Sequence, residues 1–154
     1  MSGDAETRLR ALGIELPAPP APAAAYVPAV RSGTLVFVAG QVAAAGGALV
    51  ATGKVGAEVD RDTGRRCARQ CAINVLAQLK GALGDLNAVR RVLKLTVFVA
   101  SAPGFTDQHL VADGASELLR EVLGDVGGHA RSAVGVAALP LDSPVEVDAV
   151  AEAA

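Results

Sequence analysis

The stretch over residues 89–100 constrains the fold of this chain more than any other segment. It is a nearly continuous apolar run that contains Val92, Leu93, Leu95, Val97 and Val99. A strand that is apolar along its whole length must be buried on both faces. On either side of it, over residues 63–83 and 105–123, apolar residues recur at steps of three and four, which is typical of helices. We therefore expect helices on one face of a sheet and a neighbouring subunit on the other.

Shorter segments complete the predicted order of elements. Residues 4–13 have the spacing of a short amphipathic helix, and residues 26–31 and 35–39 have the pattern of a β-hairpin. A turn at Gly46-Gly47 precedes a third predicted strand over residues 48–52. Residues 131–138 and 145–151 are predicted to be the last two strands. The resulting order, three strands, a helix, a strand, a helix and two strands, predicts an α+β fold. Its sheet is mostly antiparallel, and its two main helices lie on one face.

Prolines separate a short N-terminal part from the rest of the chain. Five of the eight prolines lie in residues 17–28. Such a segment is typical of an extended surface strap, and the chain before it is too short to fold alone. We expect residues 1–24 to form a short helix and a proline-rich strap, and residues 25–154 to form a single domain. The strap is defined here as residues 17–24.

Composition excludes several classes of protein. Only 3% of the residues are aromatic, Trp is absent and the net charge is −2, whereas nucleic-acid binding needs basic patches and stacking aromatics. One predicted helical face would carry Arg61, Arg65 and Arg69, but neighbouring acidic residues offset its positive charge. We therefore expect no nucleic-acid partner. No apolar run approaches the roughly 18–20 residues of a membrane span, and residues 1–10 carry no signal core. A cytoplasmic protein without membrane contact is expected.

Few residues have a spacing that points to chemistry. Cys67 and Cys71 lie one helical turn apart, where disulfides are rare, and with His109 and His129 they form no close ligand set, so no metal site is expected. Glycine pairs such as Gly46-Gly47 lack the context of a nucleotide-binding loop. None of the serines lies in a nucleophile motif.

The last two predicted strands hold the best candidates. Arg131 heads a row of small residues on one strand face, which leaves room for its guanidinium to bind a carboxylate by two parallel hydrogen bonds. An alternative is an arginine at a strand end that pairs with a surface acid. Glu146 and Asp148 share one face of the next strand, which alone is consistent with an ordinary polar face. A simple hairpin would pair Glu146 with about Ala137, roughly 20 Å from Arg131 and too far for one small substrate. If both act on one substrate, they must come from strands that pair differently or from different subunits.

The C-terminal third of the sequence resembles the RidA family, also known as the YjgF or endoribonuclease L-PSP family. The resemblance rests on the runs His129-Ala130-Arg131-Ser132-Ala133-Val134-Gly135-Val136 and Val145-Glu146-Val147-Asp148-Ala149. It extends in the family's order to Tyr26-Val27 and Val38-Ala39-Gly40-Gln41. The resemblance implies a chorismate-mutase-like α+β fold, assembled as a homotrimeric barrel with clefts between subunits. It also implies the cofactor-free hydrolysis of 2-imino or 2-enamino acids to 2-oxo acids and ammonia.

The same resemblance implies roles for individual residues. Arg131 would bind the substrate carboxylate and Glu146 would hold the attacking water, while Tyr26 and Gly40 would line the cleft. The family's cysteine two residues after the arginine is Ala133 here, and the serine before the glycine is Ala39. An asparagine of the second helix has no clear counterpart, although His109 lies nearby.

Two other functions remain open at this point. One is a regulatory trimer that binds a small carboxylate without turnover, which the changes at Ala133 and Ala39 allow. The other is an endoribonuclease or translation inhibitor in which His109 and His129 serve as general acid and base. The negative net charge and the scarcity of aromatics oppose the second.

Overall fold

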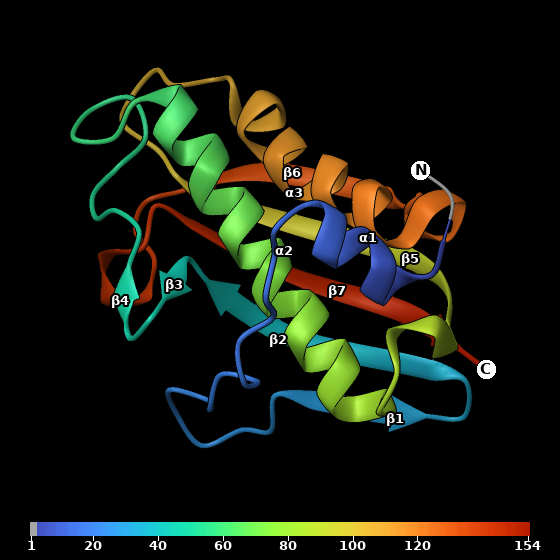
Figure 1. Ribbon diagram of the computed structural model, residues 1–154. Helices are drawn as coiled ribbons and strands as arrows, with labels where there is room; N and C mark the ends of the chain where they lie inside the picture. Colours follow the sequence, from blue (N-terminus) through green and yellow to red (C-terminus); the bar gives the residue numbers. More distant parts are fainter. Residues whose placement is uncertain (1–2) are drawn as a thin grey trace.

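The computed structural model describes residues 3–154 and contains a five-stranded sheet covered on one face by helices (Figure 1). The sheet has the order β1-β2-β7-β5-β6, with bounds β1 Ala29–Ser32, β2 Leu35–Val42, β5 Val89–Ala100, β6 Ala130–Val136 and β7 Val145–Ala153. A small hairpin is formed by β3 Ala44–Ala45 and β4 Ala48–Leu49. The helices are α1 Ala5–Ala11, α2 Arg61–Leu83 and α3 Gln108–Leu123, with 3₁₀ turns η1 Leu86–Ala88, η2 Gly124–Gly127 and η3 Pro140–Asp142.

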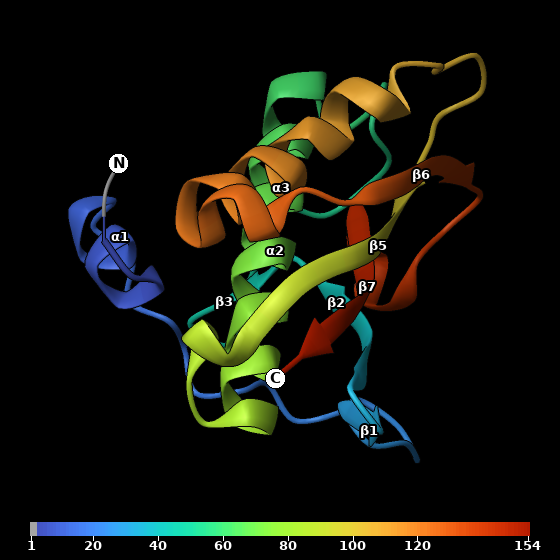
Figure 2. The ribbon, with the colours of Figure 1, turned by 90° about the vertical axis from the view of Figure 1, so that its right-hand side faces the viewer.

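The predicted α+β architecture is confirmed. Three of the four strand pairings in the large sheet are antiparallel, and only β5 and β6 run parallel. Figure 2 shows the helices together on one side of the sheet. The core between these two layers consists mainly of Val, Leu and Ala side chains, which suits a chain with few aromatics. No helix within residues 3–154 is both long and apolar enough to cross a membrane.

The expected hairpin between the last two strands is wrong. Strand β5 lies between β6 and β7, pairing in parallel with β6 and antiparallel with β7. The reason is the connection through α3, because a strand, a helix and a second strand form a crossover unit whose strands run parallel. The apolar run of β5 therefore has a partner strand on each edge as well as helices on one face.

Helices α2 and α3 pack closely side by side. A Cβ atom at Gly114 of α3 would collide with the backbone oxygen of Arg65 in α2, so only glycine permits this approach. Ion pairs bridge the same two helices on the surface, including Arg65 with Glu117 and Arg69 with Glu121. The arginine face of α2 thus pairs with acids of α3. Cys67 and Cys71 are free thiols buried on the core side of α2.

The second face of the sheet carries no helix. Along β7, buried residues alternate with half-buried ones, so that Val145 and Val147 face the helices while Glu146 and Asp148 face the other way. We call this second side the outer face. Three large apolar side chains on the strands are exposed, namely Val30 (52%), Phe37 (44%) and Val134 (42%).

Candidate functional site

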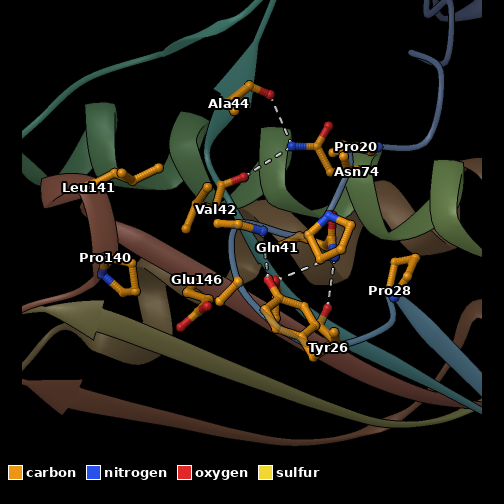
Figure 3. A pocket seen from close by; sticks show the side chains of 16 residues that line it. Pro20, Tyr26, Pro28, Gln41, Val42, Ala44, Asn74, Pro140, Leu141 and Glu146 are labelled. Atoms are coloured by element: carbon orange, nitrogen blue, oxygen red, sulfur yellow. Dashed lines mark hydrogen bonds between the residues drawn. The ribbon is translucent and has the colours of Figure 1, made fainter.

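A cavity of about 580 Å³ lies between the strap, the end of β2 and the turn η3 (Figure 3). Sixteen residues line it, and twelve of them are Pro, Ala, Gly, Val or Leu. The predicted site residues Tyr26, Gly40 and Glu146 are all among the sixteen. Apolar pockets of this size with a few polar groups are the usual form of small-molecule sites. We call it the Glu146 pocket.

Glu146 is the only carboxylate in this pocket. Among the lining residues, all of which belong to the described part of the chain, there is no Lys, Arg or His to compensate its charge. Burial raises the pKa of Glu146 above the ordinary value of a glutamate, and the negative charge of Asp148 raises it further. A carboxylate with a raised pKa, held without a cation in an apolar pocket, is suited to accept and return a proton.

Gly40 allows the carboxylate of Glu146 to lie against the backbone of β2. A Cβ atom at Gly40 would lie 2.6 Å from Oε1 of Glu146 and 2.8 Å from its carboxyl carbon. The register between β2 and β7 shifts between Val38 and Gln41, which places Gly40 in an irregular part of the strand. The reason for glycine at this position is therefore the space that Glu146 occupies.

Two amide side chains that line the pocket, Asn74 and Gln41, and the buried Gln78 beside Gln41 are engaged with other protein groups. Asn74 of α2 donates hydrogen bonds of 3.0 Å to the carbonyl oxygens of Val42 and Ala44. Gln41 donates to the carbonyl oxygen of Ala39 at 2.9 Å, and Gln78 donates to that of Pro20 at 2.7 Å. The bonds from Asn74 and Gln78 of α2 hold the end of β2, the β3 hairpin and the strap against this helix.

Arg131 lies in a different environment. Its Nη1 donates to Oδ1 of Asp113 at 2.9 Å and to Oγ of Ser116 at 3.0 Å, and its Nη2 donates to the carbonyl oxygen of His109 at 3.1 Å. All three acceptors belong to α3, so the arginine points toward the helices. Its side chain is 21% exposed. This contact is the one expected from the alternative interpretation of the sequence, in which an arginine at a strand end pairs with a surface acid.

His129 continues the hydrogen-bond network of Arg131. Its Nδ1 lies 2.7 Å from the carbonyl oxygen of Gly127, and its Nε2 lies 2.9 Å from Oγ of Ser116. Burial lowers the pKa of His129, and the charges of Arg120 and Arg131 lower it further. A neutral ring fits these contacts, with Nδ1–H donating to Gly127 and Nε2 accepting from the Ser116 hydroxyl. The histidine thus supports the group that holds Arg131.

Within one chain, Arg131 and Glu146 do not meet. Arg131 pairs with Leu95 of β5, and Glu146 pairs with Phe98 of the same strand. Three residues along β5 and two strand spacings across it separate their backbones by roughly 14 Å. Their side chains also leave opposite faces of the sheet. Ala133, the other predicted residue of β6, packs against the core on the helix side.

Sequence reasoning missed several residues of both clusters. The strap lies on the surface as expected, and its residues 20–24 also form a wall of the Glu146 pocket, which no sequence pattern indicates. No sequence pattern indicates that Asp113 and Ser116 hold Arg131. A signal for the buried Asn74 did exist, because it is an amide among the apolar positions of a long helix. Among residues 3–154, no group of three His, Cys, Asp or Glu side chains is placed to hold a metal ion.

We expect Gly40→Ala to displace the carboxylate of Glu146 while leaving the fold intact. The atoms that a Cβ would meet belong to the flexible end of one side chain, so the stability loss should stay near 1 kcal/mol. The pKa of Glu146, followed by carboxyl NMR, should fall toward its ordinary value as the group moves into solvent. Gly128→Ala is the matched control, because Gly128 has φ −69 and an added Cβ would make only an ordinary contact of 3.4 Å. An unchanged pKa of Glu146 in Gly40→Ala would contradict the assigned role of Gly40.

Comparison with known proteins agrees with this fold. The chain is 50% identical to Protein TCP17 of Trypanosoma cruzi over 154 residues, covering 98% of this chain and 95% of that protein. It is similar to the crystal structure of Atu1372 from Agrobacterium tumefaciens, a protein of unknown function (TM-score 0.91, 50% identity, 97% and 92% covered). It is also similar to RidA from the Antarctic bacterium Psychrobacter (TM-score 0.63, 26% identity, 88% and 94% covered). The sequence model of the family named Endoribonuclease L-PSP matches residues 17–153. The chain therefore belongs to the Endoribonuclease L-PSP family, the RidA family that its C-terminal strands resemble.

Proposed function

We propose that this protein hydrolyses reactive 2-imino and 2-enamino acids to 2-oxo acids and ammonia. The observation that carries the proposal is the single carboxylate of Glu146, which has a raised pKa and lies in an apolar pocket without a compensating cation. Such a group attracts a protonated imine nitrogen and can accept a proton from water. Membership in a family that includes RidA supports the same reaction class.

The reaction needs a positioned water and no strong nucleophile, because a protonated C=N carbon is already electrophilic. Glu146 would take one proton from water as the oxygen adds to that carbon. The resulting carbinolamine would receive that proton on nitrogen. Its hydroxyl oxygen would then form the C=O bond as its own proton passes to Glu146, the C–N bond would break with its electron pair going to nitrogen, and ammonia would leave the 2-oxo acid. An enamine would first be protonated on carbon to give the same iminium. Holding water and substrate together supplies much of the acceleration.

Arg131 is the proposed group for the substrate carboxylate. A guanidinium has five N–H donors, and Asp113, Ser116 and His109 engage three of them. Within residues 3–154, the Nε–H and the second Nη2–H of Arg131 have no protein acceptor. A two-point contact with a carboxylate needs two N–H donors, and these two could make it. Asp113 and Ser116 would hold the guanidinium in place while these donors face a ligand.

Because Arg131 and Glu146 leave opposite faces of the sheet, a site containing both would need residues from two copies of the chain. The outer face favours such an assembly, since it exposes Phe37 and Val134 and has no helix over it. Strand β6, which carries Arg131, is an edge of the sheet and is open to a neighbour. A homotrimer with its outer faces turned inward would cover the apolar strands and bring β6 of one copy toward the pocket of the next.

The direct test is the hydrolysis of 2-iminopropionate by the wild type and two variants. We expect Glu146→Gln to lose about 10²- to 10⁴-fold in kcat, because the acid–base group is removed while the shape is kept. Arg131→Ala should chiefly raise KM, and Arg131→Lys should not restore it, since lysine cannot make the two-point contact. Size-exclusion chromatography should show that each variant keeps the wild-type assembly. Wild-type rates in both Glu146→Gln and Arg131→Ala would contradict the proposal. Binding of 2-oxobutyrate without any rate acceleration would indicate a carboxylate-binding protein instead.

The pH dependence of kcat/KM should report the raised pKa of Glu146. The base acts when ionised, so the rate should rise with pH through that pKa and then level off. Asp148 raises this pKa by its charge, so Asp148→Asn should move the rising limb to lower pH. Asp142→Asn is the control, because Asp142 is exposed and does not act on Glu146. A limb that stays in place in Asp148→Asn, or moves to higher pH, would contradict the assignment of the limb to Glu146.

A further inference from the structure

The strap forms a continuous part of the Glu146 pocket. Residues 20–24 supply five of the sixteen lining residues, all of them Pro or Ala. The strap is held against α2 at two points. The carbonyl oxygen of Pro20 accepts a 2.7 Å hydrogen bond from Gln78, and Pro19 lies so close to Gly81 that a Cβ there would be 2.8 Å away. Because Gln78 is buried, its hydrogen bond anchors the strap at Pro20 to the interior of the fold.

The turn η3 forms the opposite wall. Pro140 and Leu141 line the pocket, and Leu141 is 67% exposed (Figure 3). Leu141 adopts a left-handed conformation with φ 61, which is unfavourable for a residue with a branched side chain. A strained residue is retained where the surrounding structure requires its position. Here it presents an apolar side chain at the pocket.

The polar groups deep in the pocket are not available to a ligand's side chain. The donors of Asn74, Gln41 and Gln78 bind backbone carbonyls that belong to the pocket walls. A ligand acceptor could bind one of these donors only by breaking one of these bonds. Apart from Glu146, the hydroxyl of Tyr26 and the engaged amides of Gln41 and Asn74, the lining is alanine, proline, glycine, valine and leucine. The free space therefore favours an apolar group.

We propose that the strap and η3 build a subsite for a bulky apolar side chain, so that the preferred substrates are 2-imino acids derived from branched aliphatic or aromatic amino acids. This inference rests on the proposed function for the reaction itself. A cavity of about 580 Å³ is far larger than a methyl or ethyl side chain requires. The iminium nitrogen would face Glu146, and the side chain would lie against the strap.

The first measurement is the affinity for 2-oxo acid products by calorimetry, which does not depend on turnover. We expect 4-methyl-2-oxopentanoate to bind at least about tenfold more tightly than pyruvate, because each methylene added in an apolar pocket contributes about tenfold or more to selectivity. The same order should hold for kcat/KM with imines generated in place by an amino acid oxidase from leucine and from alanine. Equal affinities, or tighter binding of pyruvate, would overturn the proposal.

Substitutions that fill the pocket from the β3 hairpin or from the strap test where the apolar side chain of the ligand binds. Ala44→Leu and Ala21→Leu both place a larger side chain at lining positions, and each should bring the ratio of the two affinities close to one. Ala48→Leu and Ala18→Leu are matched controls from the same hairpin and the same strap, because both alanines are exposed and neither lines the pocket. These controls should keep the wild-type ratio. Filled variants that fold and keep that ratio would overturn the subsite.

The two proposals fail in different ways. If 4-methyl-2-oxopentanoate binds selectively and the filled variants lose that selectivity, the apolar subsite stands even when no imine is hydrolysed. In that case the catalytic proposal alone is wrong. If imines are hydrolysed but alanine-derived imine is the best substrate, the catalytic proposal stands and the subsite is wrong.

Discussion

Strand β5 is the element on which the positions of Arg131 and Glu146 depend. Its apolar run accepts β6 on one edge and β7 on the other, and it packs against the helices on one face. This arrangement separates the two C-terminal strands, which a simple hairpin would have paired directly. It also sets the register that places Arg131 beside Leu95 and Glu146 beside Phe98. The charged residues of the two strands consequently face different surroundings.

Those surroundings give the two charges different chemistry. Arg131 points toward α3, where Asp113 offsets its charge and Ser116 accepts one of its hydrogen bonds. Glu146 points to the outer face and into an apolar pocket, where burial and Asp148 both disfavour its ionised form. The close approach at Gly40 keeps that carboxylate against β2. The proposed function assigns carboxylate binding to Arg131 and proton exchange to Glu146, and under that proposal a second copy of the chain would bring the two together.

Much of the fold could be predicted from the sequence, because it follows from local patterns. The periodicity of residues 63–83 and the apolar run of residues 89–100 correspond closely to α2 and β5. The pairing of β6 was not predicted, since proximity in sequence favoured a hairpin while the crossover through α3 dictates a parallel strand beside β5. The grouping of Tyr26, Gly40 and Glu146 was implied by the family resemblance alone. No local pattern relates the strap to Glu146, because the fixation of the strap depends on Gln78 and Gly81 of a distant helix.

We propose that Arg131 of one copy and Glu146 of another act on the same substrate, and mixing two variant chains tests this arrangement. Arg131→Ala and Glu146→Gln chains would be co-refolded in equal amounts and assayed with 2-iminopropionate at a concentration well below the raised KM of Arg131→Ala, where each variant alone is nearly inactive. If each site takes its arginine and its glutamate from different copies, random mixing restores about one site in four. For a site shared between two copies, we expect activity near that fraction of the wild type. A mixture no more active than the separate variants would contradict it.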